Sequence, residues 1–350
     1  MIRDIRSPIF LLGVERSGTN LLRVILDNNS NIYAPSPLHF LSRFYDSEIF
    51  YGSLLYDKNF KKLVTDALEL VYQNLGTWSG FNIKIEDVLN DISAENRSLM
   101  TVFKYIYDVQ TRNAGKRRWF CKDRELYNYV YDLKNLFPDC RFIHLVRDPR
   151  DTCLSFMLRQ KPKSIYSASI KYLGEQEKCI QLYTQPCIKD LILTVKYENL
   201  LEDSYNEVKR ICDFINEPFE DKMLNFFNNP RTKNISKKSQ VWQNLSKPIM
   251  TKNYNKYKTQ LTTKQIKLIE SMNHRIMRYF GYELEYPNQN LRFEGLFFYS
   301  YKFTNEFVAN FKSQVNRYNY EERTKRKKMQ NVIKKIRNRH YLDDNKEDKY

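Results

Sequence analysis

The stretch LLGVERSGTNLLRVILD, residues 11–27, decides the fold of this sequence. The apolar run at 9–12 is typical of a buried strand, and the apolar residues that follow Gly18 recur at helical spacing. A short polar turn that begins at Gly13 joins the two. A strand, a glycine-containing turn and a helix are the outline of a phosphate-binding loop, because the free N–H groups and the dipole of a helix N-terminus attract anions.

This loop differs from the loop of nucleoside triphosphatases. Their loop carries Gly-Lys-Ser/Thr, in which the lysine reaches the outer phosphates and the hydroxyl binds Mg²⁺. Here Gly18 is followed by Thr19 and Asn20, and Arg16 stands inside the loop instead of a lysine after the glycine. The loop therefore predicts a site for a phosphate-like anion other than Mg-ATP. The alternative is a glycine turn that only joins a strand to a helix.

The composition limits the class of protein. With 350 residues, 42% of them hydrophobic, the chain can form one large α/β domain with insertions or two modest domains. Its net charge of +17 predicts affinity for anions such as phosphorylated cofactors, acidic glycans, nucleic acid or an anionic membrane surface. The alternative is that a lysine-rich composition simply reflects the genome.

The sequence predicts neither disulfide bonds nor a membrane span. The six cysteines show no C-x-x-C spacing and no grouping with histidine, so we interpret them as reduced core residues. The first strand begins at about residue 9, which leaves no room for a signal peptide. No apolar run approaches the ~18–20 residues of a membrane helix. We therefore expect a cytoplasmic protein.

Strand and helix patterns alternate along the chain. Apolar runs typical of strands occur at 118–123, 141–146 and 191–197, and each is followed by a helical pattern. This alternation predicts a three-layer α/β/α fold with a central parallel sheet. In such sheets ligands bind beyond the carboxyl ends of the strands.

Two regions fall outside this alternation. Residues 46–115 are helical and carry no chemical motif, so we interpret them as an insertion in a main domain, 1–285, that shapes the site of a second substrate. A helical, basic extension follows at 286–350. Its most basic part, 323–339, is either a solvated helix or one that rests on an anionic membrane.

A second polar motif follows the strand at 141–146. Arg147 stands at the strand end, Ser155 follows eight residues later in the next helix, and Arg159 lies one turn beyond. These spacings bring the three side chains toward one spot, and an arginine fork matches phosphate oxygens. Two anion sites at neighbouring strand ends predict a nucleotide that carries phosphates at both ends.

Together, GVERSGTNLLRVILD and FIHLVRDPRDTCLSF resemble two motifs of the sulfotransferases that use 3′-phosphoadenosine 5′-phosphosulfate (PAPS) and release 3′,5′-adenosine bisphosphate (PAP). The similarity is to their bacterial and tyrosylprotein branch and covers about 8–40 and 118–282. It implies a P-loop-containing nucleotide-binding fold. The residues that it implies for donor binding are Arg16, Ser17, Gly18, Thr19, Asn20, Arg147, Ser155, Arg159, Tyr197 and Lys256.

The resemblance also implies catalytic residues. Arg16 and Lys122 are expected to stabilise the charge that develops in sulfuryl transfer, without a metal ion. The catalytic glutamate of the tyrosylprotein branch would fall at Pro37, which cannot accept a proton. His39 has an ordinary pKa near neutrality and is the candidate general base, with simple packing as the alternative. His144, within a predicted strand, is interpreted as a core residue.

The sequence thus predicts transfer of a sulfuryl group from PAPS to a hydroxyl, or less readily an amine, of a glycan, lipid, small molecule or peptide. Two alternatives stay open. One is a nucleotide-dependent kinase, which the missing Gly-Lys-Ser/Thr disfavours. The other is a protein that binds nucleic acid or an anionic surface without catalysis, although the sequence contains no recognisable RNA-reading strand or recognition helix. We expect no nucleic-acid partner.

Overall fold

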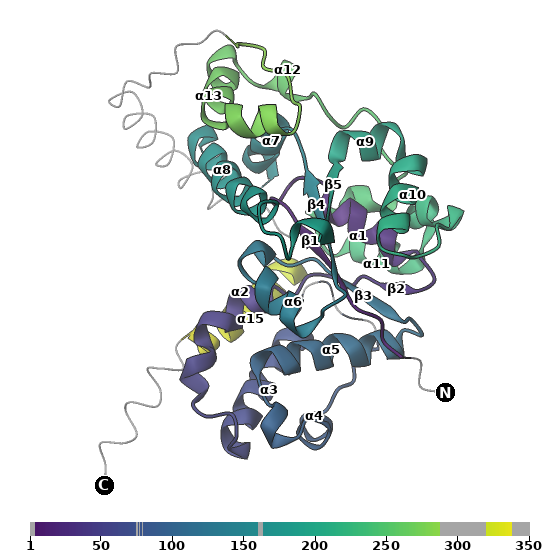
Figure 1. Cartoon of the computed structure of the whole chain (residues 1–350), viewed down its shortest axis with the longest axis vertical. Coiled ribbons are helices and arrows are strands. Elements are labelled where there is room, and N and C mark those ends of the chain that lie inside the picture. The colour runs from purple at the N-terminus through teal and green to yellow at the C-terminus, as the bar shows by residue number, and fades with distance from the viewer. Residues whose placement is uncertain are drawn as a thin grey trace, which may run out of the picture.

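The computed structural model describes residues 4–74, 76, 78, 80–159, 164–287 and 320–337. Within these ranges, five parallel strands form one sheet in the order β2-β3-β1-β4-β5 (Figure 1). The strands are β1 (Ile9–Leu12), β2 (Ile32–Tyr33), β3 (Arg118–Cys121), β4 (Arg141–Val146) and β5 (Ile192–Lys196). This sheet confirms the predicted α/β fold.

The strand order defines where a ligand is expected. After β1 the chain moves to one side of the sheet, toward β2 and β3, and after β4 it moves to the other side, toward β5. The carboxyl ends of β1 and β4 therefore flank the point at which the connections diverge, the usual position of a ligand in such sheets. Both polar motifs of the sequence follow these two strands.

Helices cover both faces of the sheet, because neighbouring residues of each strand point to opposite sides. In β1, Ile9 and Leu11 pack in a cluster with α1 and α10, whereas Phe10 and Leu12 pack in a cluster with α2, α3, α5 and α6. A third cluster joins the end of β4 to α7, α8 and α13. These helices are α1 (Thr19–Asp27), α2 (Leu41–Phe44), α3 (Asp57–Tyr72), α5 (Leu99–Asn113), α6 (Val130–Leu136), α7 (Pro149–Arg159), α8 (Ile165–Leu182), α10 (Ser204–Phe214) and α13 (Thr263–Tyr279).

Shorter elements complete the described fold. The remaining α-helices are α4 (Ile85–Asp91), α9 (Tyr197–Glu202), α11 (Pro230–Lys237), α12 (Tyr257–Gln260) and the later helix α15 (Tyr320–Arg337). The 3₁₀ helices are η1 (Tyr45–Tyr51), η2 (Ala94–Asn96), η3 (Leu126–Asn128), η4 (Lys189–Leu191), η5 (Asp221–Asn228) and η6 (Gln240–Ser246).

The structure differs from the sequence prediction at the strand ends. Residues Ile32–Tyr33, which the sequence pattern did not predict as a strand, pair with β3 as an edge strand too short to show a periodicity. Lys122 follows the end of β3, and Tyr197 begins α9 instead of ending β5. Both shifts place predicted site residues just beyond the sheet.

The predicted insertion forms a helical lobe, defined here as α2 to α5 (residues 41–113), which lies below the sheet in Figure 1. The helix α15 packs against α2 and α3 of this lobe. Its side chains Val332 and Ile336 are buried, so α15 is not solvated all round. The predicted membrane contact of the basic segment stays a prediction, and its residues 338–339 lie outside the described ranges.

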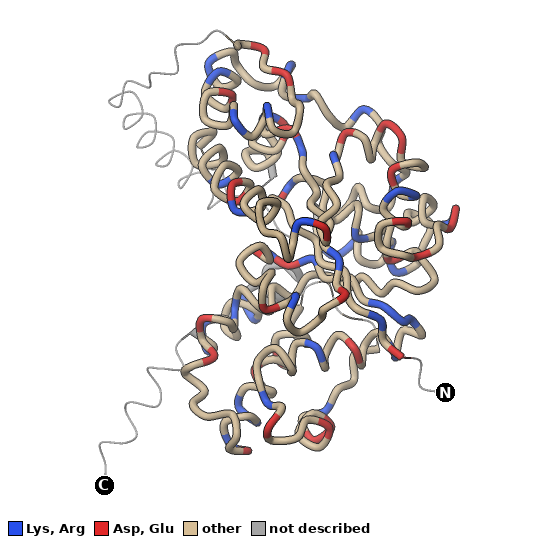
Figure 2. The backbone as a smooth tube through the Cα atoms, in the orientation of Figure 1, with Lys and Arg blue, Asp and Glu red and all other residues tan. Residues whose placement is uncertain are grey.

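Several simpler predictions concern the core and the surface. His144 is fully buried in β4, and its Nδ1 lies 2.9 Å from the hydroxyl of Tyr183. All six cysteines are free thiols; five are buried and Cys187 is exposed. None of the helices in the described ranges is long and apolar enough to cross a bilayer. Figure 2 shows basic and acidic residues interspersed over both the sheet and the helical lobe, so in this view the charge does not gather on one face.

Candidate active site

The loop between β1 and α1 turns in a way that glycine permits. Gly13 has φ +138°, and a Cβ atom there would lie 2.5 Å from the carbonyl oxygen of Leu145 in β4. Arg16 and Gly18 have φ of +75° and +88°. The carbonyl of Gly18 accepts the first helical hydrogen bonds of α1, so the N–H groups of the residues just after it have no intrahelical acceptor. The loop therefore presents free donors at the positive end of a helix dipole.

Tyr197 explains why the second glycine is needed. A Cβ atom at Gly18 would overlap the Tyr197 ring, which lies at the start of α9. The Tyr197 hydroxyl accepts a hydrogen bond of 2.7 Å from the side-chain amide of Asn253. The same ring lies 4.5 Å from the guanidinium carbon of Arg147. Tyr197 thus holds three separate segments of the chain together.

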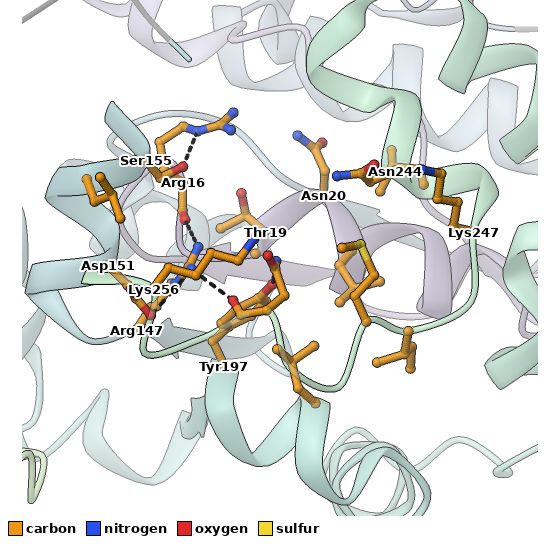
Figure 3. A pocket seen from close by; sticks show the side chains of 18 of the residues that line it. Arg16, Thr19, Asn20, Arg147, Asp151, Ser155, Tyr197, Asn244, Lys247 and Lys256 are labelled. Carbon is orange, nitrogen blue, oxygen red and sulfur yellow. Dashed lines mark hydrogen bonds and ion pairs between the residues drawn. The ribbon is translucent and has the colours of Figure 1, made fainter. Parts of the chain in front are cut away.

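A pocket of about 250 Å³ opens above these loops (Figure 3). It is lined by side chains from the loop after β1, from α7, from α9 and from the segment 244–260. The predicted residues among the lining are Arg16, Gly18, Thr19, Asn20, Arg147, Ser155, Tyr197 and Lys256. Residues from four distant parts of the sequence therefore meet at the carboxyl ends of β1 and β4.

The two sequence motifs are in direct contact. Arg16 Nε donates a hydrogen bond of 3.2 Å to Ser155 Oγ, and Arg147 Nη1 donates one of 3.0 Å to the carbonyl oxygen of Arg16 (Figure 3). Arg147 Nη2 donates to the carbonyl oxygen of Asn253 at 3.1 Å and lies 3.7 Å from Asp151 Oδ2. Arg147 is buried, with its guanidinium held on two sides by backbone carbonyls. Its position in the wall of the pocket is therefore fixed.

Three residues predicted to bind the donor differ from the others in burial or position. Ser17 does not line the pocket; it is fully buried behind the loop, and its Oγ has no hydrogen-bond partner among the described residues. Asn20 lines the pocket, and its Oδ1 is buried and likewise lacks a partner in the described chain. Arg159 is the last residue of α7, and its side chain lies outside what the structure describes.

The sequence analysis missed part of the lining. Asn253 and Asp151 contact Arg147, and Asn244 and Lys247 lie on the opposite side of the pocket (Figure 3). In the segment around Asn253, the resemblance to sulfotransferases implied a role for Lys256 alone. Polar residues of an irregular segment carry no periodicity, so only the packing of the segment over Tyr197 assigns them to the site.

The predicted catalytic residues Lys122 and His39 do not line this pocket. Lys122 lines a neighbouring cavity of about 10 Å³, roughly the space of one water molecule, which shares Thr19 with the larger pocket. Glu15 and Lys171 line it as well, and Glu15 pairs with Arg124 at 2.6 Å. Burial lowers the pKa of Lys122 to about 8, against the opposing attraction of Glu15.

His39 is held in an unusual conformation. Its φ is +55°, and its backbone N–H donates to Asp123 Oδ1 at 2.7 Å, while the N–H of Phe40 donates to Asp123 Oδ2 at 2.7 Å. The buried carboxylate of Asp123 therefore fixes the turn that carries the imidazole. The Arg124 N–H donates to His39 Nδ1 at 3.2 Å.

These contacts bear on the predicted role of His39 as a base. Burial, helped by the positive charges of Arg124, Lys122 and Arg43, lowers the pKa of His39 well below its ordinary value. A neutral imidazole whose Nδ1 accepts a hydrogen bond carries its proton on Nε2. In this arrangement His39 donates through Nε2, and accepting a proton would require Nδ1 to give up its bond to Arg124.

The fold and this pocket define an α/β protein in which the two motifs predicted to bind anions line one cavity. The sequence profile of the Sulfotransferase family matches residues 8–221, more than half of the chain. The protein belongs to the sulfotransferase family. In the part of the chain that the structure describes, no group of three or more His, Cys, Asp and Glu side chains is arranged to hold a metal ion.

Named relatives agree with the family. The chain is 24% identical over 234 residues to a putative protein-tyrosine sulfotransferase of Caenorhabditis briggsae, covering 64% of this chain and 70% of that protein. It is 23% identical over 229 residues to protein-tyrosine sulfotransferase A of Caenorhabditis elegans, covering 62% and 51%. An uncharacterized Aquifex aeolicus protein is 22% identical over 265 residues, 73% of this chain but only 31% of that protein. The chain thus spans about a third to seven-tenths of these relatives.

Solved structures share the fold. The sulfotransferase domain from the curacin biosynthetic pathway superposes with a TM-score of 0.55 at 19% identity, covering 80% of this chain and 99% of that domain. The sulfotransferase domain of the Synechococcus PCC 7002 olefin synthase gives a TM-score of 0.53 at 22% identity, covering 81% and 97%. At this level of identity the likeness concerns the fold alone.

Proposed function

We propose that the protein transfers a sulfuryl group from PAPS to a hydroxyl of an acceptor molecule, without a metal ion. The observation that carries this proposal is the contact between the two anion motifs, in which Arg16 bonds Ser155 and Arg147 bonds the backbone of Arg16. A nucleotide with phosphates at its 5′ and 3′ ends needs two such sites within one pocket.

The residues present fit this donor. The free N–H groups at the start of α1, with the side chains of Thr19 and Asn20, suit the oxygens of a 5′-phosphosulfate. Arg147, Ser155 and Lys256, which line the same pocket, would hold the 3′-phosphate through charge-assisted hydrogen bonds. Arg159 is assigned to the same phosphate on its sequence spacing alone.

The reaction forms one S–O bond and breaks another. The acceptor oxygen attacks sulfur, the bond from sulfur to the 5′-phosphate oxygen breaks, and PAP leaves with the bonding electrons while the acceptor hydroxyl loses its proton to solvent water. Arg16, in the loop, and Lys122, at the end of β3, would stabilise the negative charge that develops on the leaving oxygen. Arg16 follows β1 and Lys122 follows β3, and these two strands are adjacent in the sheet.

His39 would contact the acceptor. As a neutral ring with Nε2–H it can donate a hydrogen bond to the acceptor oxygen or to a sulfuryl oxygen, and this orients the attack. As a base it would have to lose the Arg124 N–H bond first. We propose that His39 donates a hydrogen bond. The general-base role predicted from the sequence is the alternative, and the His39 variants described in the Discussion distinguish the two roles.

Calorimetric titration of the purified chain with PAP, 5′-AMP and Mg-ATP tests the proposal. PAP is expected to bind most tightly, and at a hundred times its dissociation constant it should stabilise the fold by about 2.7 kcal/mol. Tighter binding of Mg-ATP than of PAP would overturn the donor assignment in favour of a kinase.

Transfer itself is tested with PAPS and a panel of acceptors: a tyrosine peptide, a glycan, a lipid and a phenol. The tyrosine peptide is included because named relatives are protein-tyrosine sulfotransferases. Formation of PAP together with a sulfated product is the expected result. Tight PAP binding without transfer to any cellular extract would leave a PAP-binding protein that is not an enzyme.

A further inference from the structure

The helix α15 is anchored on the helical lobe by an apolar stripe and by charges. Val332 and Ile336, one turn apart, are 3% and 0% exposed and join the same core cluster as α2, α3 and α5. Lys335 Nζ lies 3.2 Å from Asp66 and 3.3 Å from Glu69, both on α3. In Figure 1 the helix lies directly beside α2. Removing it would expose apolar surface of the lobe.

The contact of α15 with α2 leads toward the candidate acceptor side. Arg43, on α2, contacts Met329 of α15 through Nη1, at 3.4 Å from the sulfur. The same Nη1 donates a hydrogen bond of 2.6 Å to the carbonyl oxygen of Leu38. Leu38 immediately precedes His39, so one guanidinium joins the C-terminal helix to the backbone of the turn that carries the imidazole.

That turn has further supports: Ser42 Oγ donates to the carbonyl oxygen of His39 at 3.2 Å, Asn74 Nδ2 donates to that of Pro37 at 3.2 Å, and the side chains of Leu38 and Phe40 are fully buried. Asp123 binds the two backbone N–H groups after Leu38, and Arg124 binds the ring of His39. Arg43 is the contact that fixes the Leu38 carbonyl from the side of the lobe. Because His39 has a positive φ, which costs about 1 kcal/mol or more for a residue with a side chain, the turn keeps its shape only while these contacts persist.

We propose that α15 acts as a brace for the acceptor side of the active site, and that Arg43 is a positioning residue that transmits its support to the Leu38–His39 turn. The proposal rests on the proposed function, because it assumes that His39 faces the acceptor. Neither α15 nor Arg43 lines the donor pocket. The helix therefore controls the rate of transfer and leaves the affinity for PAP unchanged.

The first test uses Arg43→Gln and Arg43→Lys in the full-length chain. Arg43→Gln is expected to lower kcat roughly 10- to 100-fold, the usual effect of misplacing a reacting group, with unchanged PAP affinity. It should also speed amide hydrogen exchange at His39 and Phe40. The pKa of His39, followed by NMR, should rise because one of the positive charges around it is gone. Arg43→Lys should recover part of the rate, because lysine keeps the charge and one donor.

The second test detaches the helix. Ile336→Asp places a charge in the core of the lobe, and Lys334→Asp, on the exposed side of the same helix, is the matched control. Met329→Ala is a milder variant that removes the contact with Arg43 together with the partly buried packing of Met329 on the lobe. Ile336→Asp and Met329→Ala are expected to reproduce the exchange change at His39 and Phe40, while Lys334→Asp should not.

The exchange and NMR measurements need no sulfuryl transfer, so they separate this inference from the proposed function. Unchanged exchange at His39 and Phe40 in both Arg43→Gln and Met329→Ala would overturn the brace. A loss of PAP affinity equal to the loss of kcat would also overturn it, because the helix would then support the whole fold. If the exchange changes but no acceptor is ever sulfated, the brace stands and the proposed function fails.

Discussion

The donor side and the acceptor side of the active site are built in different ways. The donor pocket consists of side chains that hold one another: Arg147 is bonded to two backbone carbonyls and lies against Tyr197, which is bonded to Asn253. The acceptor side depends on single residues, His39 and Lys122, each adjusted by burial and by neighbouring charge.

The largest effect is expected on the acceptor side. His39→Ala should lower kcat about 10²- to 10³-fold, as loss of one hydrogen-bond donor in an active site does, with unchanged PAP affinity by calorimetry. His39→Gln is the matched variant, because its amide can still donate. If His39→Gln retains much more activity than His39→Ala, His39 acts as a hydrogen-bond donor. If both variants are equally inactive and the wild type alone loses activity in the acid range, His39 acts as a base.

A glycine on the donor side tests how rigid that pocket is. Gly18→Ala forces a side chain into a left-handed conformation and against the Tyr197 ring, strain worth about 2–3 kcal/mol, so PAP affinity should fall on the order of 10²-fold. Gly115→Ala is the control: its φ is also positive, at +67°, but no atom lies within 4 Å of the added Cβ. Normal PAP binding by Gly18→Ala would mean that Tyr197 moves freely, and the contrast between the two sides would weaken.

Arg147→Ala tests the proposed contact between Arg147 and the 3′-phosphate. A charge-assisted hydrogen bond contributes about 1.5–3 kcal/mol, so PAP affinity should drop roughly 10- to 150-fold. 5′-AMP should lose much less, and only through the contact of Arg147 with the Arg16 backbone. Arg141→Ala, at the other end of β4, is the control and should change neither affinity. Equal losses for both ligands would assign Arg147 to the fold alone.

The smallest effect concerns two histidines, the fully buried His144 in β4 and the partly exposed His39. Burial lowers the pKa of His144 to about 4 and that of His39 well below its ordinary value. The unfolded chain therefore binds more protons below about pH 6.5, and stability present above that pH is lost as the pH falls toward the folded-state values. As the pH falls from 7 to 5.5, each histidine should lower the free energy of unfolding by about 1 kcal/mol. Urea titration at the two pH values measures this loss. His144→Gln should flatten this loss; an unchanged slope would mean that other groups cause it.

The meeting of Arg16, Thr19, Arg147 and Ser155 in one pocket could be predicted, because each lies in a short contiguous motif at a strand end. Their binding of the donor stays a prediction. Asn253 could not be found, since it lies in an irregular segment whose place depends on packing against distant residues.

On the proposed acceptor side, the sequence predicted which residues to consider but not their conformation or their contacts. The positive φ of His39, its clamp by Asp123 and the occupied Nδ1 are tertiary facts, and the ordinary histidine pKa used in the sequence argument does not apply to a buried ring. The helix α15 carried a readable signal: Val332 and Ile336 stand four residues apart within a basic stretch, and that spacing indicates a packed face.

The position of α15 in the chain also orders the events of synthesis. Lys335 and its partner Glu69 are 266 residues apart, so at about 5–20 residues per second the lobe waits roughly 13–53 s for its last helix. During that interval the loops that form the donor pocket are all made, while the groove for Val332 and Ile336 stays uncovered. A chain still on the ribosome would thus form the pocket proposed for the donor before the Leu38–His39 turn gains its support from α15.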